Sequence, residues 1–168
     1  LEKVLRFWLD KGVDGFRLDS VCVYFKDPKF RDFPVRSTAY APSSFSALSK
    51  YFVDHVLERP ENVLALERIR ELLDEYAPER IAIGESASEK GIQSYLEFSS
   101  PGRLHLAFNF EFLNAVCLDA AKVASVVSRT DSLFDTRAWP CYVLGHHDGE
   151  RLLSRVNRDG SAPDAAAA

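Results

Sequence analysis

The feature that most constrains the fold of this 168-residue sequence is an alternation of helical and extended segments. Apolar residues at helical spacing predict helices, and short apolar runs bounded by turn residues predict the strands between them. Such alternation predicts an α/β fold with a parallel sheet and right-handed helical crossovers. The predicted order is helix, strand, helix, strand, helix, strand, helix, strand, helix.

The predicted strands are short, and most of the predicted helices are amphipathic. The strands cover residues 13–19, 81–85, 105–110 and 139–144. The helices lie at residues 4–9, 43–58, 62–73, 89–98, 112–127 and 150–156, and the second and third of them share the connection between the first two strands. Asn62 is predicted to cap its helix after an interruption at Pro60, because a side-chain oxygen satisfies free amides there. Residues 21–41 have no clean period and predict a long loop.

Composition excludes several classes of function. The chain is 46% hydrophobic and 27% charged with a net charge of −4, which fits one folded core and no nucleic-acid partner. We expect no membrane span and no signal peptide, and a cytoplasmic location by default. Three widely spaced cysteines are interpreted as packed thiols. The many charges between Glu58 and Glu79 predict a solvated helix face.

Three predicted strands end in an acidic residue: Asp19, Glu85 and Asp148. The carboxyl ends of parallel strands meet at one mouth, so three acids at such ends are expected to converge. Paired carboxylates are what glycoside hydrolysis requires, one near the sugar carbon and one that transfers a proton. Arg17 lies two residues before Asp19, so both side chains point to the same face of the strand. A guanidinium there would lower the pKa of Asp19 and orient it.

These strand ends resemble, in the same order, motifs of the α-amylase family, glycoside hydrolase family 13. The segments are Gly-Phe-Arg-Leu-Asp at 15–19, Ile-Gly-Glu at 83–85 and Leu-Gly-His-His-Asp at 144–148. Further segments resemble the sixth and seventh strands of the bacterial α-glucosidase branch, at residues 101–105, 108–113 and 137–141. The resemblance implies a partial (β/α)₈ TIM barrel, approximately strands 4 to 7 with their helices. Residues 1–160 would be a C-terminal-half segment of the catalytic domain, and residues 161–168 a frayed tail.

The resemblance also implies roles for individual residues. Asp19 would be the nucleophile, Glu85 the general acid/base and Asp148 the transition-state stabiliser. Four residues are expected to bind substrate: Arg17 beside Asp19, His147 on the same sugar, Arg151 in the pocket and Phe110 as an aromatic wall. No cofactor and no metal is expected.

The function implied is that of a retaining α-glucosidase segment, which cleaves α-glucosides such as maltose or sucrose through a covalent glycosyl-enzyme intermediate. Ser20, directly after the nucleophile, favours α-1,4 linkages within this resemblance. Two alternatives remain open: a transglycosylase or sucrose/maltose isomerase of the same family, and a non-catalytic truncated relative. A barrel relative that serves as the heavy chain of an amino-acid transporter belongs to the second alternative.

One residue departs from the family pattern, and both ends suggest a longer parent. His146 stands where the family usually has Asn. The chain contains no methionine and closes on four alanines, so we expect that it was cut from a longer protein. The missing remainder of the barrel is then a required partner, and we expect the isolated fragment to be inactive, poorly soluble and prone to associate.

Overall fold

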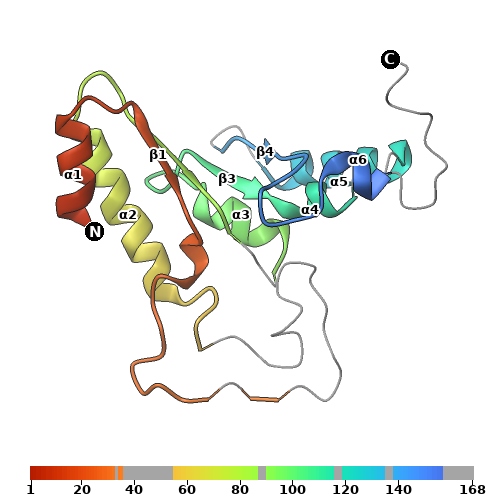
Figure 1. Cartoon of the computed structure of the whole chain (residues 1–168), viewed down its shortest axis with the longest axis horizontal. Coiled ribbons are helices and arrows are strands. Elements are labelled where there is room, and N and C mark those ends of the chain that lie inside the picture. The colour runs from red at the N-terminus through yellow and green to blue at the C-terminus, as the bar shows by residue number, and fades with distance from the viewer. Residues whose placement is uncertain (33, 36–54, 87–89, 116–118, 135–137, 157–168) are drawn as a thin grey trace.

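A computed structural model describes residues 1–32, 34–35, 55–86, 90–115, 119–134 and 138–156 (Figure 1). Its strands are β1 (Gly15–Leu18), β2 (Ile81–Gly84), β3 (Leu106–Asn109) and β4 (Cys141–Tyr142). Its helices are α1 (Glu2–Asp10), the 3₁₀ turn η1 (Val21–Val23), α2 (Pro60–Asp74), α3 (Ile92–Phe98), α4 (Phe110–Ala115), α5 (Ala120–Leu133) and α6 (Leu152–Val156). None of the described helices is long and apolar enough to cross a membrane.

The four strands form one parallel sheet in the order β1-β2-β3-β4. Arg17 pairs with Ile83, and Ile83 in turn pairs with Leu106 of β3. Each strand therefore lies beside the next in chain order, with helices in the connections, and the predicted parallel α/β topology is confirmed. This register also brings the carboxyl ends of β1 and β2 to one level, where Asp19 and Glu85 follow directly.

The core lies between the sheet and its helices. Leu18 and Ala82 point from the sheet toward the buried Leu66 and Leu72 of α2 and the buried Phe98 of α3. Because side chains alternate along a strand, the neighbouring residues point to the opposite face. That face carries Arg17, Ile83 and Phe108, and it is the face from which the acids extend.

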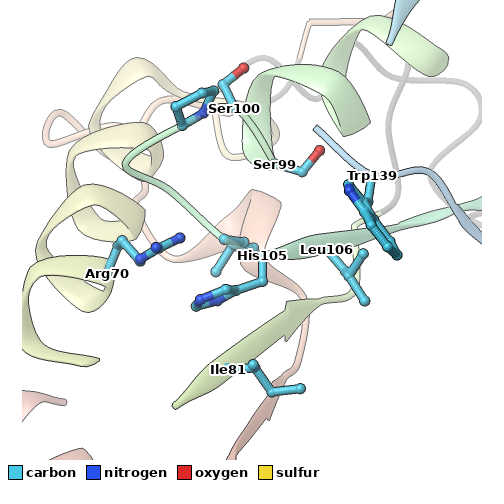
Figure 2. A pocket seen from close by; sticks show the side chains of 9 residues that line it. Arg70, Ile81, Ser99, Ser100, His105, Leu106 and Trp139 are labelled. Atoms are coloured by element: carbon cyan, nitrogen blue, oxygen red, sulfur yellow. The ribbon is translucent and has the colours of Figure 1, made fainter. Parts of the chain in front are cut away.

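A cavity of about 300 Å³ lies at the amino ends of β2 and β3, the end of the sheet opposite to the acids (Figure 2). Ile81, Leu106 and Trp139 contribute its apolar wall. His105 lines it as well, and its Nδ1 accepts a hydrogen bond from the Ala82 amide at 3.0 Å. Because Nδ1 accepts this bond, a neutral imidazole carries its proton on Nε2. The same bond ties His105, just before β3, to β2. Burial lowers the pKa of His105 and favours this neutral form.

Helix α1 is apolar on two sides. Leu5 and Leu9 are buried against the core, and α1 lies beside α2 in Figure 1. Val4, Phe7 and Trp8 are exposed on the other side of the same helix. The helical spacing predicted from the sequence is confirmed, but Val4 and Trp8 lie outside the core of this chain.

The prediction of one helix over residues 112–127 is wrong. Two helices occupy this region, α4 ending at Ala115 and α5 beginning at Ala120. Asp119 begins the second one, because its carboxylate accepts hydrogen bonds from the amides of Ala121 and Lys122 at 3.0 and 3.2 Å. The apolar period continues across this boundary, so periodicity alone does not reveal it.

The predicted capping role of Asn62 is also wrong. Helix α2 begins at Pro60, whose missing amide hydrogen is no loss in the first turn. Asn62 therefore lies inside the helix, fully buried, and its side chain bonds to another segment. The predicted helix 43–58 lies mostly outside the described residues, and residues 55–58 form a turn.

Candidate active site

Arg17 joins the two acids at the ends of β1 and β2. Its Nη2 lies 2.6 Å from Oε2 of Glu85, and its Nη1 donates to Oδ1 of Asp19. The Asp19 side chain is 70% exposed, whereas that of Glu85 is 14% exposed. One guanidinium thus orients an open carboxylate and a covered one. The sequence prediction that Arg17 holds Asp19 agrees with this geometry, and the contact with Glu85 extends it.

Backbone hydrogen bonds hold the same two strand ends together. The Glu85 amide donates to Leu18 O at 2.9 Å, and the Val21 amide donates to Glu85 O at 2.8 Å. Between them Ser20 adopts a left-handed conformation, with φ 45° and ψ 47°. This turn sends the chain from Asp19 back toward β2, so the acids stay adjacent through main-chain bonds as well as through Arg17.

Gly84 permits close packing directly before Glu85. A Cβ at this position would overlap Leu104 Cδ1 and lie 3.2 Å from Val21 Cγ2. The first contact would force the buried Leu104 side chain to move, and the second would require a shift of a few tenths of an ångström at Val21. Close packing around position 84 therefore favours the glycine of the Ile-Gly-Glu motif in this fold.

The two acids have opposite pKa shifts. The pKa of Asp19 lies below its ordinary value, because its carboxylate accepts a hydrogen bond from Glu85 and another from Arg17. The pKa of Glu85 lies above its ordinary value, because burial disfavours its charged form and its proton is shared with Asp19. Arg17 and the Ser20 amide oppose this second shift, and burial outweighs them. An ionised Asp19 beside a protonated Glu85 is the division of roles that a nucleophile and an acid need.

His147 and Asp148 approach this pair from the segment after β4. His147 Nε2 lies 3.3 Å from Asp148 Oδ2, and both side chains are exposed. When His147 is protonated, its charge contributes to lowering the pKa of Asp19, so its imidazole lies within electrostatic reach of the first acid. The described residues therefore bring Arg17, Asp19 and Glu85 into direct contact, and His147 lies within electrostatic reach of Asp19. The convergence of Asp148 with the other two acids stays a prediction.

Phe110 and His146 form the neighbouring aromatic contact. Their ring centroids are 5.5 Å apart, and the Phe110 and Phe108 centroids are 6.3 Å apart. Phe110 is only 6% exposed in this chain, so most of its ring is covered. The aromatic wall expected at Phe110 stays a prediction, and the ring's contact in the structure is with His146.

Two arginines that follow Asp148 donate hydrogen bonds to backbone carbonyl groups. Arg151 Nη1 donates to His146 O at 3.0 Å. Arg155 of α6 donates to Leu144 O and, at 2.5 Å, to Leu113 O. The substrate-pocket role expected for Arg151 stays a prediction, and its contact in this structure supports the turn.

Two supporting residues were missed by sequence reasoning. Asn62 Nδ2 donates to Cys22 O at 2.7 Å, and its Oδ1 accepts from the Phe25 amide at 3.0 Å. Glu58 was predicted on a solvated face, yet its side chain is 8% exposed and accepts from Ser94 Oγ. Its amide also donates to Cys22 O at 2.8 Å. Both residues brace the turn after Asp19, and no local pattern distinguishes them from an ordinary cap and a surface charge.

Ligands for a metal ion do not gather anywhere in the described part of the chain. It contains no group of three or more His, Cys, Asp and Glu side chains able to hold a metal ion. The groups that the described residues do bring to the carboxyl end of the sheet are the paired carboxylates, Arg17 and the His147–Asp148 pair.

Two neighbouring carboxylates of opposite pKa shift, at the carboxyl end of a parallel α/β sheet, are the kind of arrangement that glycoside hydrolysis requires. The family model described as "Alpha amylase, catalytic domain" matches residues 1–168. The chain belongs to this family, and its sheet is part of a (β/α)₈ barrel, as the resemblance implied.

Similar proteins agree with that assignment. A Rhizobium meliloti (strain 1021) protein described as "Probable alpha-glucosidase" is 37% identical over 162 residues, covering 90% of this chain. An "Alpha-glucosidase" of Culex pipiens is 31% identical over 172 residues, covering 95% of this chain. The crystal structure of the alpha-glucosyl transfer enzyme XgtA superposes with a TM-score of 0.82 at 34% identity over 96% of this chain. This chain spans 28% of the length of each of the two α-glucosidase relatives and 30% of XgtA.

Proposed function

We propose that the complete protein containing this chain is a retaining α-glucosidase that hydrolyses small α-glucosides. The observation that carries the proposal is the pair Asp19 and Glu85, joined by Arg17 and shifted in opposite directions in pKa. The family assignment and the two α-glucosidase relatives support it.

In this proposal each group has one task. Asp19 attacks the anomeric carbon of the sugar and forms a covalent bond, while Glu85 gives its proton to the departing glycosidic oxygen. Water then attacks the glycosyl-enzyme as it gives a proton to Glu85, which restores both acids. Asp148 binds sugar hydroxyls in the transition state, and His147 hydrogen-bonds the same ring. Arg17 holds the carboxylates in position throughout.

The test is made on the protein encoded by the complete reading frame. Wild-type protein should release glucose from maltose, and NMR of the first product should show the α-anomer. Asp19→Asn should lower kcat by about a thousandfold or more, because the nucleophile is lost. Asp14→Asn is the matched control, since Asp14 lies at the other end of β1 and pairs with Arg80. Initial release of β-glucose, or near wild-type turnover in Asp19→Asn, would overturn the proposal.

A second candidate function is glucosyl transfer, which the similarity to XgtA specifically favours. Transfer uses the same acids and differs in whether water or a sugar hydroxyl accepts the glucosyl group. Product analysis on concentrated maltose and sucrose separates the two. Two glucose molecules per maltose bond cleaved, or equal amounts of glucose and fructose from sucrose, indicate hydrolysis, whereas trisaccharides or isomeric disaccharides indicate transfer.

The proposed linkage preference is α-1,4, and it depends on Ser20. This residue directly follows Asp19, and its backbone is in the left-handed region. We expect a higher kcat/KM on maltose than on isomaltose. A preference for isomaltose would remove the α-1,4 assignment and leave the retaining mechanism intact.

A further inference from the structure

His146 and Gly149 occupy complementary space in the turn that carries His147 and Asp148. A Cβ built on Gly149 would lie 2.5 Å from His146 Nε2 and 2.9 Å from its Cε1. The backbone of Gly149 is not in the left-handed region that favours glycine, so conformational freedom does not account for a glycine there. A side chain at position 149 would require the imidazole to move, because its Nε2 and Cε1 lie where that side chain would begin.

The imidazole also packs against an aromatic ring. Phe110 lies with its centroid 5.5 Å from that of His146, and Phe110 itself is buried. His146 Nδ1 is buried and makes no hydrogen bond to the described residues. The ring therefore packs against Phe110 at the start of α4 and against the turn at Gly149.

The main chain of His146 is fixed by a separate contact. Arg151 Nη1 donates to its carbonyl at 3.0 Å, and Arg155 donates to the carbonyl of Leu144 two residues earlier. The position of the turn is thus set by the carbonyl contacts and by the volume of the imidazole together. A shift of either His146 or Gly149 moves the two residues between them.

We propose that His146 and Gly149 are a coupled positioning pair, in which the imidazole, seated between Phe110 and Gly149, sets the place of His147 and Asp148. This proposal rests on the proposed function, because His147 and Asp148 are the groups that would bind the sugar. It assigns a role to the residue at which the sequence departs from its family. His146 is a positioning residue that acts through its neighbours.

The test is a double-mutant cycle in the complete protein, with maltose as substrate. Gly149→Ala should lower kcat by about tenfold or more with little change in KM, because the new methyl group displaces the turn. In a His146→Asn background the same change should alter kcat by less than about twofold, because the space is open. His146→Phe is the matched control, since it keeps the ring against Phe110 and should leave Gly149→Ala as harmful as before. Thermal midpoints of all variants separate displacement of the turn from loss of folding.

Each outcome bears on the pair. Equal effects of Gly149→Ala in the wild-type and His146→Asn backgrounds, on both kcat and thermal midpoint, would overturn the proposal. If the wild-type protein fails to cleave maltose, the proposed function fails separately. The pair is then judged on the thermal midpoint alone. If Gly149→Ala lowers the midpoint in the wild-type background and not in the His146→Asn background, the coupling is supported. An equal decrease in both backgrounds refutes it.

Discussion

Arg17 Nη2 and Glu85 Oε2 lie 2.6 Å apart although 68 residues separate them in the sequence. The contact crosses the β1–β2 pair at the level where both strands end. Because the same guanidinium contacts Asp19, both carboxylates depend on one side chain for their distance and orientation. This dependence makes the site sensitive to Arg17 in ways that can be measured.

Replacing Arg17 should move both limbs of the pH profile in the same direction. The hydrogen bond from Glu85 and that from Arg17 hold the pKa of Asp19 down, and Arg17 also opposes the rise of the pKa of Glu85. In the proposed mechanism activity requires ionised Asp19, so kcat/KM rises with pH through the pKa of Asp19. It also requires protonated Glu85, so kcat/KM falls through the pKa of Glu85. Arg17→Gln raises both pKa values, and the whole bell of kcat/KM against pH moves to higher pH.

The control for that change is Arg80→Gln, which removes an arginine paired with Asp14 at the other end of β1. Its pH profile should match the wild type. A profile of Arg17→Gln that keeps both limbs in place would show that Arg17 does not set the charge state of the acids.

Replacing Glu85 should affect substrates according to their leaving group. Glu85→Gln removes the proton donor, so kcat on maltose should fall by about a thousandfold, or about 4 kcal/mol. The p-nitrophenolate group of a p-nitrophenyl α-glucoside leaves without protonation, so the rate of glycosylation with this substrate should fall much less. Burst kinetics on both substrates measure the difference. Equal losses on the two would contradict the acid role of Glu85.

Replacing Asn62 should destabilise the protein from a position remote from substrate. Its buried amide binds Cys22 O and the Phe25 amide, so Asn62→Leu leaves the Phe25 amide without its partner. Loss of a buried hydrogen bond costs about 1–3 kcal/mol. Urea unfolding of the complete protein measures this. Leu64→Ala on the exposed side of α2 is the control and should change stability by less than about 0.5 kcal/mol. A neutral Asn62→Leu would show that the bridge contributes nothing.

The 168 residues produced alone should associate. Val4, Phe7 and Trp8 on α1 are exposed, as are Ile81 and Trp139 at the strand starts. Exposed apolar groups beside an unpaired strand edge favour association. Light scattering after size exclusion should show oligomers, with fewer of them in a Phe7→Ser/Trp8→Ser variant. A monomer with a cooperative near-UV CD melt would contradict this expectation.

Some supporting contacts were not predictable from local sequence. Asn62 lies in the first turn of a helix, where Asn usually caps, and Glu58 stands in a run of charges that usually faces solvent. Both are buried because the turn after β1 packs onto α2 and α3, a relation between segments far apart in the chain. The break between α4 and α5 was missed for a different reason, since Asp119 interrupts an apolar period that continues on both sides.

From the sequence alone, the parallel sheet, the order of the three acids and the common face of Arg17 and Asp19 followed, because these depend on local periods and on where each strand ends. Only the tertiary structure decided that Arg17 also binds Glu85, that Asn62 and Glu58 brace the turn after Asp19, and that His146 occupies the space beside Gly149. Each of these is a distance between atoms of different segments, or a volume filled within a turn. Such distances and volumes leave no periodic signal in the sequence, so these contacts are determined only when the segments pack together.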